Sequence, residues 1–115
     1  MEDRYILKGI RVIEAASMVL VPSTAAVMAD FGAEVIKVEP PGGGDIHRYG
    51  HQLPGMPESE VPYTFQVENR NKRSICLNLK EQAGRDILKG LVQVADVFLT
   101  NYRSAALAKL EMTYE

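Results

Sequence analysis

The feature that most constrains the fold of this chain is the alternation of short β-branched runs with helical segments. Four runs have the length and composition of strands: 9–15, 34–39, 74–79 and 96–101. Helical patterns separate the first run from the second and the third from the fourth, with short connections. Such alternation predicts right-handed crossovers and a parallel sheet. The sequence therefore predicts an α/β, Rossmann-like parallel sheet with flanking helices.

Two segments carry the helical signal. The Ala-rich segment 22–31 begins with Pro22, which suits a first helical turn, and is followed by Gly32, which suits the residue just past a helix end. Segment 81–94 places its apolar residues on one helical face. Both segments lie between expected strands, so they are the predicted crossover helices.

Residues 40–62 interrupt this pattern. Five of the six prolines and five of the nine glycines fall there, so the segment is predicted to be a long irregular loop. Loops of that length are usually functional. A helical stretch over 105–110 is incomplete where the sequence stops. That is an abrupt place for a natural domain to stop, so we expect the predicted fold to be incomplete.

Bulk properties restrict the partners. The formal net charge is −2, which gives no electrostatic argument for nucleic acid or for an anionic membrane surface. With one cysteine, no internal disulfide is possible, and a reducing compartment is the default. The charged N-terminus, 1–5, does not resemble a secretion signal. The predicted location is the cytoplasm, with no nucleic-acid or membrane partner.

The carboxyl ends of the four expected strands predict where a ligand binds. In open parallel sheets, ligands bind beyond those ends, which all lie along one edge. Here the segments at that edge are 16–23, 39–51, the neighbourhood of Lys80, and 101–104. We expect them to converge on a single ligand.

The first of these segments, 16–23, joins a strand to a helix whose free N–H groups suit an anion or an adenine edge. It contains no glycine, whereas a dinucleotide fold needs glycines there, which argues against NAD even though Glu39 occupies the place of a ribose-binding acid. A plain helix cap with packed apolar residues is the alternative interpretation. Both interpretations remain open for this turn.

Other polar groups give weaker signals. The glycine run that ends at Asp45 is more typical of a flexible loop than of a phosphate cradle. His47 and His51 lack a third ligand at a metal spacing, so no metal is assigned. The basic segment 69–74 favours a solvated edge. Cys76 lies in the middle of a predicted strand and is interpreted as a buried structural thiol.

Two segments at the sheet edge offer groups for a phosphorylated ligand. Lys80 can pair with phosphate as a point charge, Arg103 can grip it with two hydrogen bonds, and Tyr102 offers a flat face to an adenine ring. Ordinary surface charge and one half-buried aromatic are the alternative. The gathering of such groups at one edge makes the functional interpretation competitive.

The order of these motifs resembles the class III coenzyme A (CoA) transferase family, which includes formyl-CoA transferase, carnitine CoA-transferase and alpha-methylacyl-CoA racemase. The matching stretches cover nearly the whole chain in the right order, and the combination is specific although each motif alone is not. They are 7–14, 28–40, Gly44-Asp45, Asn69-Arg70-Asn71-Lys72-Arg73-Ser74, 77–80, Gly84-Arg85, 95–97 and Asn101-Tyr102-Arg103.

The resemblance implies that the single domain, 1–115, is the incomplete N-terminal part of a larger CoA-binding domain, that is, a fragment. It also implies a site for CoA, bound as a substrate. The family's positions that contact adenine, ribose and phosphates fall on Met18, Val19, Leu20, Leu77, Lys80, Asn101, Tyr102 and Lys109. It also implies acyl-CoA and carboxylic acid substrates, and a homodimer of the full-length protein. Transfer of CoA between acyl groups is then the expected activity of the complete enzyme.

The resemblance places the chemistry elsewhere. In the family an aspartate forms acyl anhydride intermediates, and its position lies beyond the matched region, so none of the aspartates of this chain is assigned to it. No catalytic residue is predicted here. The alternatives are an acyl-CoA racemase of the same family, a nicotinamide-dependent dehydrogenase domain, and a non-catalytic nucleotide-binding module.

Overall fold

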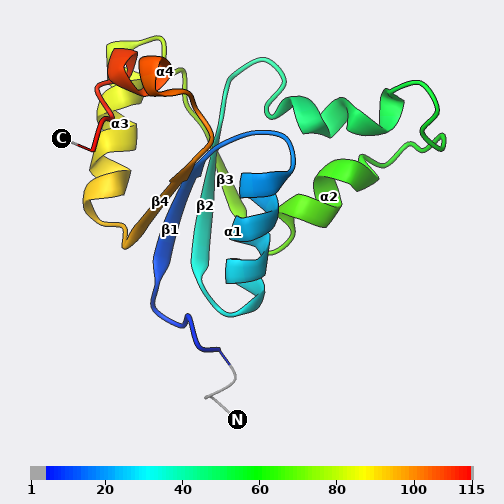
Figure 1. Cartoon of the computed structure of the whole chain (residues 1–115), viewed down its shortest axis with the longest axis horizontal. Coiled ribbons are helices and arrows are strands. Elements are labelled where there is room, and N and C mark those ends of the chain that lie inside the picture. Colours follow the sequence, from blue (N-terminus) through cyan, green and yellow to red (C-terminus); the bar gives the residue numbers. More distant parts are fainter. Residues whose placement is uncertain (1–4, 115) are drawn as a thin grey trace.

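The computed structural model describes residues 5–114, so residues 1–4 and 115 of the predicted domain lie outside the described residues. Its elements follow one another as β1 (Arg11–Ala15), α1 (Leu20–Asp30), β2 (Glu34–Glu39), the 3-10 helix η2 (Ile46–Gln52), α2 (Tyr63–Asn69), β3 (Arg73–Cys76), α3 (Gln82–Gln93), β4 (Val97–Thr100) and α4 (Ser104–Lys109) (Figure 1). Within 5–114, no helix is long and apolar enough to cross a bilayer.

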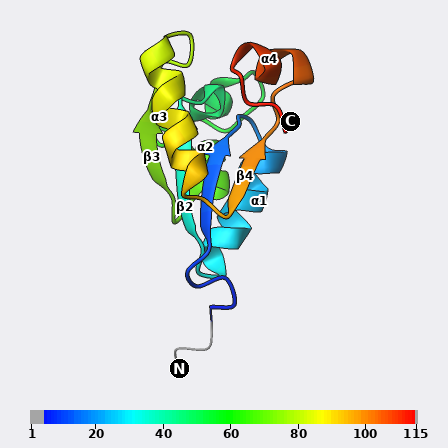
Figure 2. The same cartoon turned by 90° about the vertical axis from the view of Figure 1, so that its left-hand side faces the viewer.

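The four strands form one parallel sheet in the order β3-β2-β1-β4. Val12 of β1 is in register with Val35 of β2 on one side and with Val97 of β4 on the other. Helix α1 covers one face of the sheet and α3 the opposite face (Figures 1 and 2). The predicted parallel α/β fold is thus confirmed.

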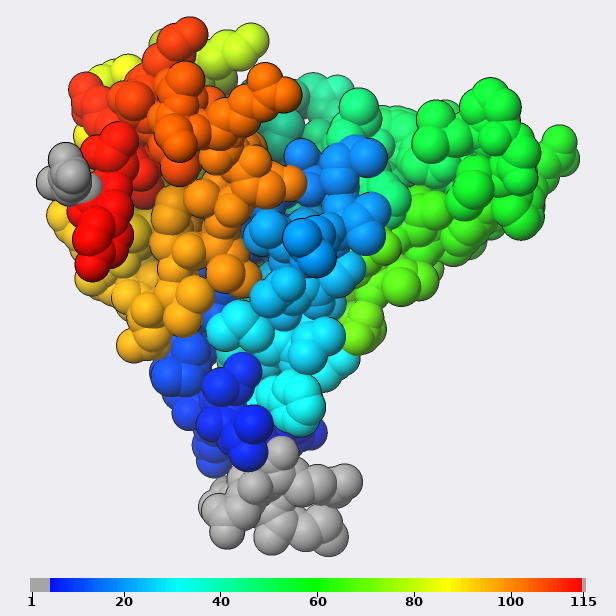
Figure 3. Space-filling model, viewed as in Figure 1, coloured from blue at the N-terminus to red at the C-terminus, as the bar shows by residue number. Residues whose placement is uncertain are grey.

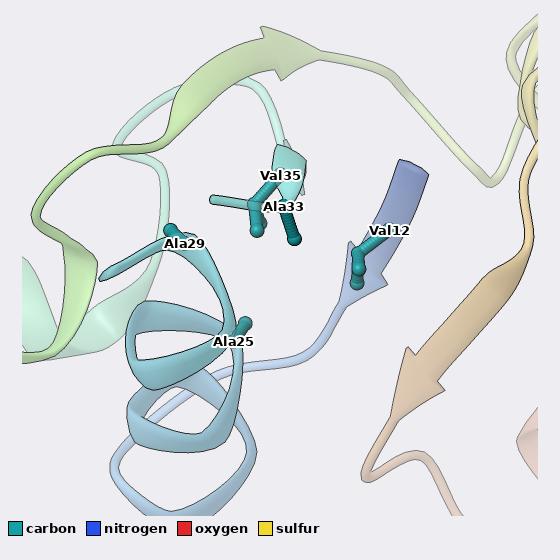
Figure 4. Close-up of a cluster of buried hydrophobic side chains, with 5 residues drawn as sticks. All are labelled: Val12, Ala25, Ala29, Ala33 and Val35. Atoms are coloured by element: carbon teal, nitrogen blue, oxygen red, sulfur yellow. The ribbon is translucent and has the colours of Figure 1, made fainter. Parts of the chain in front are cut away.

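A small apolar core lies on each face. Between the sheet and α1, Val12 and Val35 pack against Ala25, Ala29 and the nearby Ala33 (Figure 4). The alanines let the helix approach the strands closely, because their side chains occupy little space between the two layers. A second cluster lies on the α3 face and consists of Ile13, Ala15, Val38, Leu77 and Leu88. The two clusters use alternate residues of β1, as the strand period requires.

Helix α1 differs slightly from the prediction. It begins at Leu20 rather than at Pro22, and it ends at Asp30. Gly32 then adopts a φ of 99°, the left-handed conformation that favours glycine past a helix end, and donates its N–H to the Ala29 carbonyl. The signals at both ends were therefore accurate to within two residues.

The third strand was predicted too long, because it ends at Cys76 and not at residue 79. Residues Leu77 to Lys80 leave the sheet and turn toward α3. The interpretation of Cys76 as a buried thiol was also wrong, since its side chain is exposed. The physical reason is that β3 is an edge strand, flanked by β2 alone.

Segment 40–62 is not wholly irregular, because it contains η2. The Asp45 carboxylate accepts the N–H of His47 and caps this helix. Helices η2 and α2, with the chain between them, form an arm that projects away from the sheet (Figure 3). The radius of gyration of 15.0 Å exceeds the roughly 13 Å expected for a compact domain of this length, in keeping with that projection.

Candidate functional site

A cleft of about 810 Å³ opens at the carboxyl edge of the sheet. Its walls come from the end of β2, the segment that leaves β3, and α4. Ligand pockets typically have about 300–1,000 Å³, so a cofactor-sized molecule fits this space. Four of the predicted site residues line the cleft: Leu77, Lys80, Tyr102 and Lys109.

One wall of the cleft is apolar. Leu77 is buried in the α3-side core, and Tyr102 packs against that same core. Burial raises the pKa of the Tyr102 phenol, so the ring stays neutral at physiological pH. A neutral aromatic face beside a buried leucine is suited to a flat heterocyclic ring.

Three cations also line the cleft. Lys80 and Lys109 are exposed, and Arg85 of α3 lies between the helix and the segment that carries Lys80. Arg85 donates from Nη1 to the carbonyls of Leu79 (3.2 Å) and Lys80 (2.9 Å), which fixes that segment. Arg85 was not among the predicted site residues and belongs only to the Gly84-Arg85 motif of the resemblance. Together the three cations suit an anionic ligand such as a phosphate.

The other four predicted residues lie outside this cleft. Met18 and Val19 lie in the turn between β1 and α1, and Leu20 is the first residue of α1; these residues are 47%, 45% and 79% exposed. Asn101 joins the end of β4 to this turn: its Nδ2 donates to the Ser17 carbonyl at 2.8 Å, and its Oδ1 accepts the Ser17 N–H at 3.3 Å. Asn101 therefore connects the turn to the strand end that carries Tyr102.

Beneath this edge lies a group that the sequence did not predict, the buried ion cluster of Glu14, Lys37, Asp45 and Lys72. Their side chains are at most 2% exposed. Lys37 Nζ lies 2.6 Å from Glu14 Oε1 and 2.9 Å from Asp45 Oδ2, while Lys72 Nζ lies 2.7 Å from Glu14 Oε2. Two carboxylates and two ammonium groups balance, which is the condition under which buried charges are tolerated.

One sequence signal could have found part of this cluster. Glu14 and Lys37 are each charged residues within a β-branched run, and they are direct partners in the β1–β2 register. A charge in a central strand has no access to water and needs a partner of opposite sign. Lys72 gave no such signal, because its partner Glu14 is 58 residues distant in the sequence. Burial lowers the pKa of Lys72, against the opposing effect of Glu14.

A second ionic contact closes the loop after β2. Burial of Glu39 acts to raise the pKa of its carboxyl, but hydrogen bonds from Arg48 and from the Ser74 hydroxyl outweigh that effect. The Asp45 backbone N–H, 2.9 Å away, also donates to this carboxylate. The resulting pKa of Glu39 is about 2. Since Glu39 lines the cleft, its fixed negative charge is part of the wall.

The prediction of a solvated edge for the basic segment 69–74 holds for Arg70 and Arg73, whose side chains are 45% and 68% exposed, but it is wrong for Lys72, which is buried. Arg70 pairs with Asp30 of α1, and Arg73 pairs with Glu34 of β2. Lys72 is the buried member between them. The segment therefore holds β3 and α2 against the rest of the sheet rather than meeting a ligand.

The two histidines of the arm have protein partners. His47 Nε2 lies 2.6 Å from a Glu68 carboxylate oxygen, and the His51 ring meets the Tyr63 ring edge-on at 6.0 Å. In the described range, 5–114, no three His, Cys, Asp or Glu side chains are grouped as metal ligands would be.

The chain matches a known family model over residues 7–115, that of CoA-transferase family III. It is 44% identical over 108 residues to the cinnamoyl-CoA:phenyllactate CoA-transferase of Clostridium sporogenes. The matched region is 93% of this chain and 26% of that protein. It is 38% identical over 109 residues to a formyl-CoA:oxalate CoA-transferase of Escherichia coli, where the matched region is 95% of this chain and 26% of that protein. The chain thus spans about a quarter of the length of these relatives.

The fold has a counterpart among solved structures. A CAIB/BAIF family protein from Brucella suis superposes with a TM-score of 0.83 at 33% sequence identity. The similarity covers 97% of this chain and 30% of that protein. By sequence and by fold alike, the chain therefore corresponds to between a quarter and a third of a longer protein.

Proposed function

Because the chain belongs to CoA-transferase family III, we propose that it supplies the nucleotide-binding edge of an enzyme that transfers CoA between acyl groups. The observation that carries this proposal is the composition of the cleft. It combines an aromatic face, Tyr102, with a cationic rim to which Lys80 and Lys109 belong. CoA presents an adenine ring and phosphates, the two groups that such a surface recognises.

The substrates follow from the class of reaction. A CoA-transferase takes an acyl-CoA as donor and a carboxylic acid as acceptor, and we propose both for the enzyme to which this chain contributes. Its relatives named above are transferases, which supports transfer over racemisation. CoA enters as a substrate, and the proposal needs no metal.

The covalent chemistry is assigned outside this chain. Acyl transfer by this route requires a carboxylate nucleophile, and we assign that role to no residue of the chain. Asp45, the buried aspartate nearest the cleft, accepts two backbone N–H groups and lies against Lys37, so it is engaged in structure. We further propose a homodimeric, cytoplasmic enzyme as the setting for the site.

Calorimetric titration with three candidate ligands tests which ligand the cleft binds. We expect the protein to bind CoA more tightly than dephospho-CoA, which lacks one phosphate, and more tightly than NADH. Equal affinities for CoA and NADH would overturn the assignment of CoA. If CoA and dephospho-CoA bound equally well while NADH bound more weakly, the cations of the cleft would not contact the ribose 3′-phosphate of CoA.

A further inference from the structure

The turn between β1 and α1, together with the first helical turn of α1, is tied at three backbone points to the buried ion cluster. Lys37 Nζ donates to the Ala16 carbonyl at 3.0 Å, and Lys72 Nζ donates to the Pro22 carbonyl at 2.8 Å. Between them, the Met18 N–H donates to Asp45 Oδ1 at 3.2 Å. The buried cluster therefore holds the beginning of the turn, its middle and the start of α1.

The conformation of Met18 explains why the turn needs this support. Its φ is 68°, a left-handed conformation that a residue with a Cβ adopts only under constraint. The hydrogen bond to Asp45 fixes the peptide plane that precedes Met18. Without an acceptor at that point, an ordinary extended or helical conformation would be more favourable for this residue.

The turn presents apolar side chains to solvent. Met18, Val19 and Leu20 are all 45% or more exposed, although apolar cores lie on both faces of the sheet nearby. A segment that is held rigidly outward, on a scaffold of buried hydrogen bonds, is arranged in advance to receive a ligand. A turn without that support could fold its side chains inward.

Asp45 also connects this turn to the wall of the cleft. Its carboxylate holds Met18, whereas its backbone N–H donates to Glu39, a residue of the cleft wall. Asn101 makes a second connection, through Ser17, to the strand end that carries Tyr102. The turn and the cleft are thus parts of one framework.

We propose that Asp45 is a positioning residue for CoA binding: with the buried ion cluster, it holds the β1–α1 turn in the conformation that receives the ligand. This inference rests on the proposed function for the identity of the ligand. The mechanical part, the constraint on Met18, does not depend on that identity. The two parts therefore need separate measurements.

The first measurement needs no substitution. Hydrogen exchange of backbone amides, read by NMR on the protein, reports whether the Met18 N–H is hydrogen-bonded. Met18 lies at an exposed turn outside any helix or strand, so protection of its amide has to come from the bond to Asp45. We expect slow exchange at Met18. Exchange as fast as in an unstructured peptide would overturn the proposal.

The second measurement compares two matched variants. Substituting Lys37→Met together with Asp45→Asn, or with Asp45→Ala, removes the same charges and leaves Glu14 paired with Lys72. The variants then differ in the acceptor that position 45 offers to the N–H groups of Met18 and His47. We expect the variant with alanine to bind CoA about tenfold more weakly than the variant with asparagine, and its turn to exchange faster.

The outcomes separate the two hypotheses. Equal CoA affinities in the two variants would overturn the positioning role, whatever their stabilities. If the unsubstituted protein does not bind CoA but its Met18 amide is protected, the proposed function fails and the constraint on the turn stands. Asp86 is an exposed residue of α3, so the substitution Asp86→Ala serves as the control for the general effect of losing a carboxylate.

Discussion

Arg48 grips Glu39 at two points: its Nε lies 2.8 Å from Oε1 and its Nη2 lies 2.7 Å from Oε2. The guanidinium also lies over the Phe65 ring, 3.9 Å from its centroid, which links α2 to the same contact. One ion pair therefore connects the end of β2, the 3-10 helix and α2. Its strength should be visible in the acid stability of the protein.

The first prediction concerns pH. The pKa of Glu39 falls from 4.5 in the unfolded chain to about 2 in the folded protein. Its contribution is therefore complete above pH 4.5 and is lost as the pH falls to about 2, because only the unfolded state takes up a proton in that window. We expect this group to account for about 3 kcal/mol of the free energy of unfolding. Urea denaturation from pH 6 to pH 2.5 measures it.

The control for that experiment is a second glutamate of the same chain. The substitution Glu39→Gln should flatten the acid dependence, whereas substituting the exposed Glu58 by Gln should not. An unaltered pH dependence in Glu39→Gln would contradict the assigned pKa.

The second prediction concerns Lys80. Replacing it by alanine should raise the dissociation constant for CoA about tenfold or more, because a charged hydrogen bond contributes about 1.5–3 kcal/mol. The free energy of unfolding should change little, since Lys80 is exposed. Lys8→Ala removes an exposed lysine that does not line the cleft and should leave the constant as it is. Calorimetry that finds no difference between these variants would leave Lys80 as a solvated residue.

The third prediction separates the ring of Tyr102 from its hydroxyl. If the aromatic face stacks on adenine, Tyr102→Phe should keep CoA affinity, while Tyr102→Leu should lose about 1–3 kcal/mol of binding free energy. Leucine preserves most of the apolar contact with the α3-side core, so the comparison reports stacking more than packing. Similar dissociation constants for the phenylalanine and leucine variants would exclude a stacking role.

The fourth prediction uses two glycines of α3. A Cβ on Gly84 would overlap the backbone carbonyl of Asn78, whereas a Cβ on Gly90 meets nothing within 4 Å. Gly84→Ala should therefore destabilise the protein by about 1–3 kcal/mol. Gly90→Ala should stabilise it by up to about 1 kcal/mol, as expected for a helix interior. Thermal melts of the two variants should shift in opposite directions, and shifts of the same sign would contradict the close packing at Gly84.

Local patterns were sufficient for the sheet but not for what lies beneath its edge. The runs around Val12 and Val35 are β-branched and short, so their strands and parallel order followed from composition and spacing. The end of β3 did not, because Leu77 and Leu79 continue the apolar alternation of the run, although the strand ends at Cys76 and both leucines pack into the α3-side core. Such contacts carry no local signal.

The same distinction holds for the candidate site. Lys80 and Tyr102 were predicted at one edge because parallel strands end together, and the structure brings both to one cleft. The sequence pattern around Asp45 is typical of a flexible glycine-rich loop. Its role depends on contacts with Met18, 27 residues away in the sequence, and with Lys37 of the neighbouring strand, and no local pattern predicts these contacts.

The strand order also determines when each strand can find its partner during synthesis on the ribosome. Strand β1 is first in the sequence and central in the sheet, yet its second neighbour is β4, and the bond from the Arg11 N–H to Asp96 spans 85 residues. At about 5–20 residues per second, synthesis of that interval takes about 4–17 s. During this time β1 has an open edge of unpaired N–H and C=O groups. The nascent chain is therefore most vulnerable to mispairing at its oldest strand, and chaperones that bind extended apolar segments would find β1 accessible until β4 emerges.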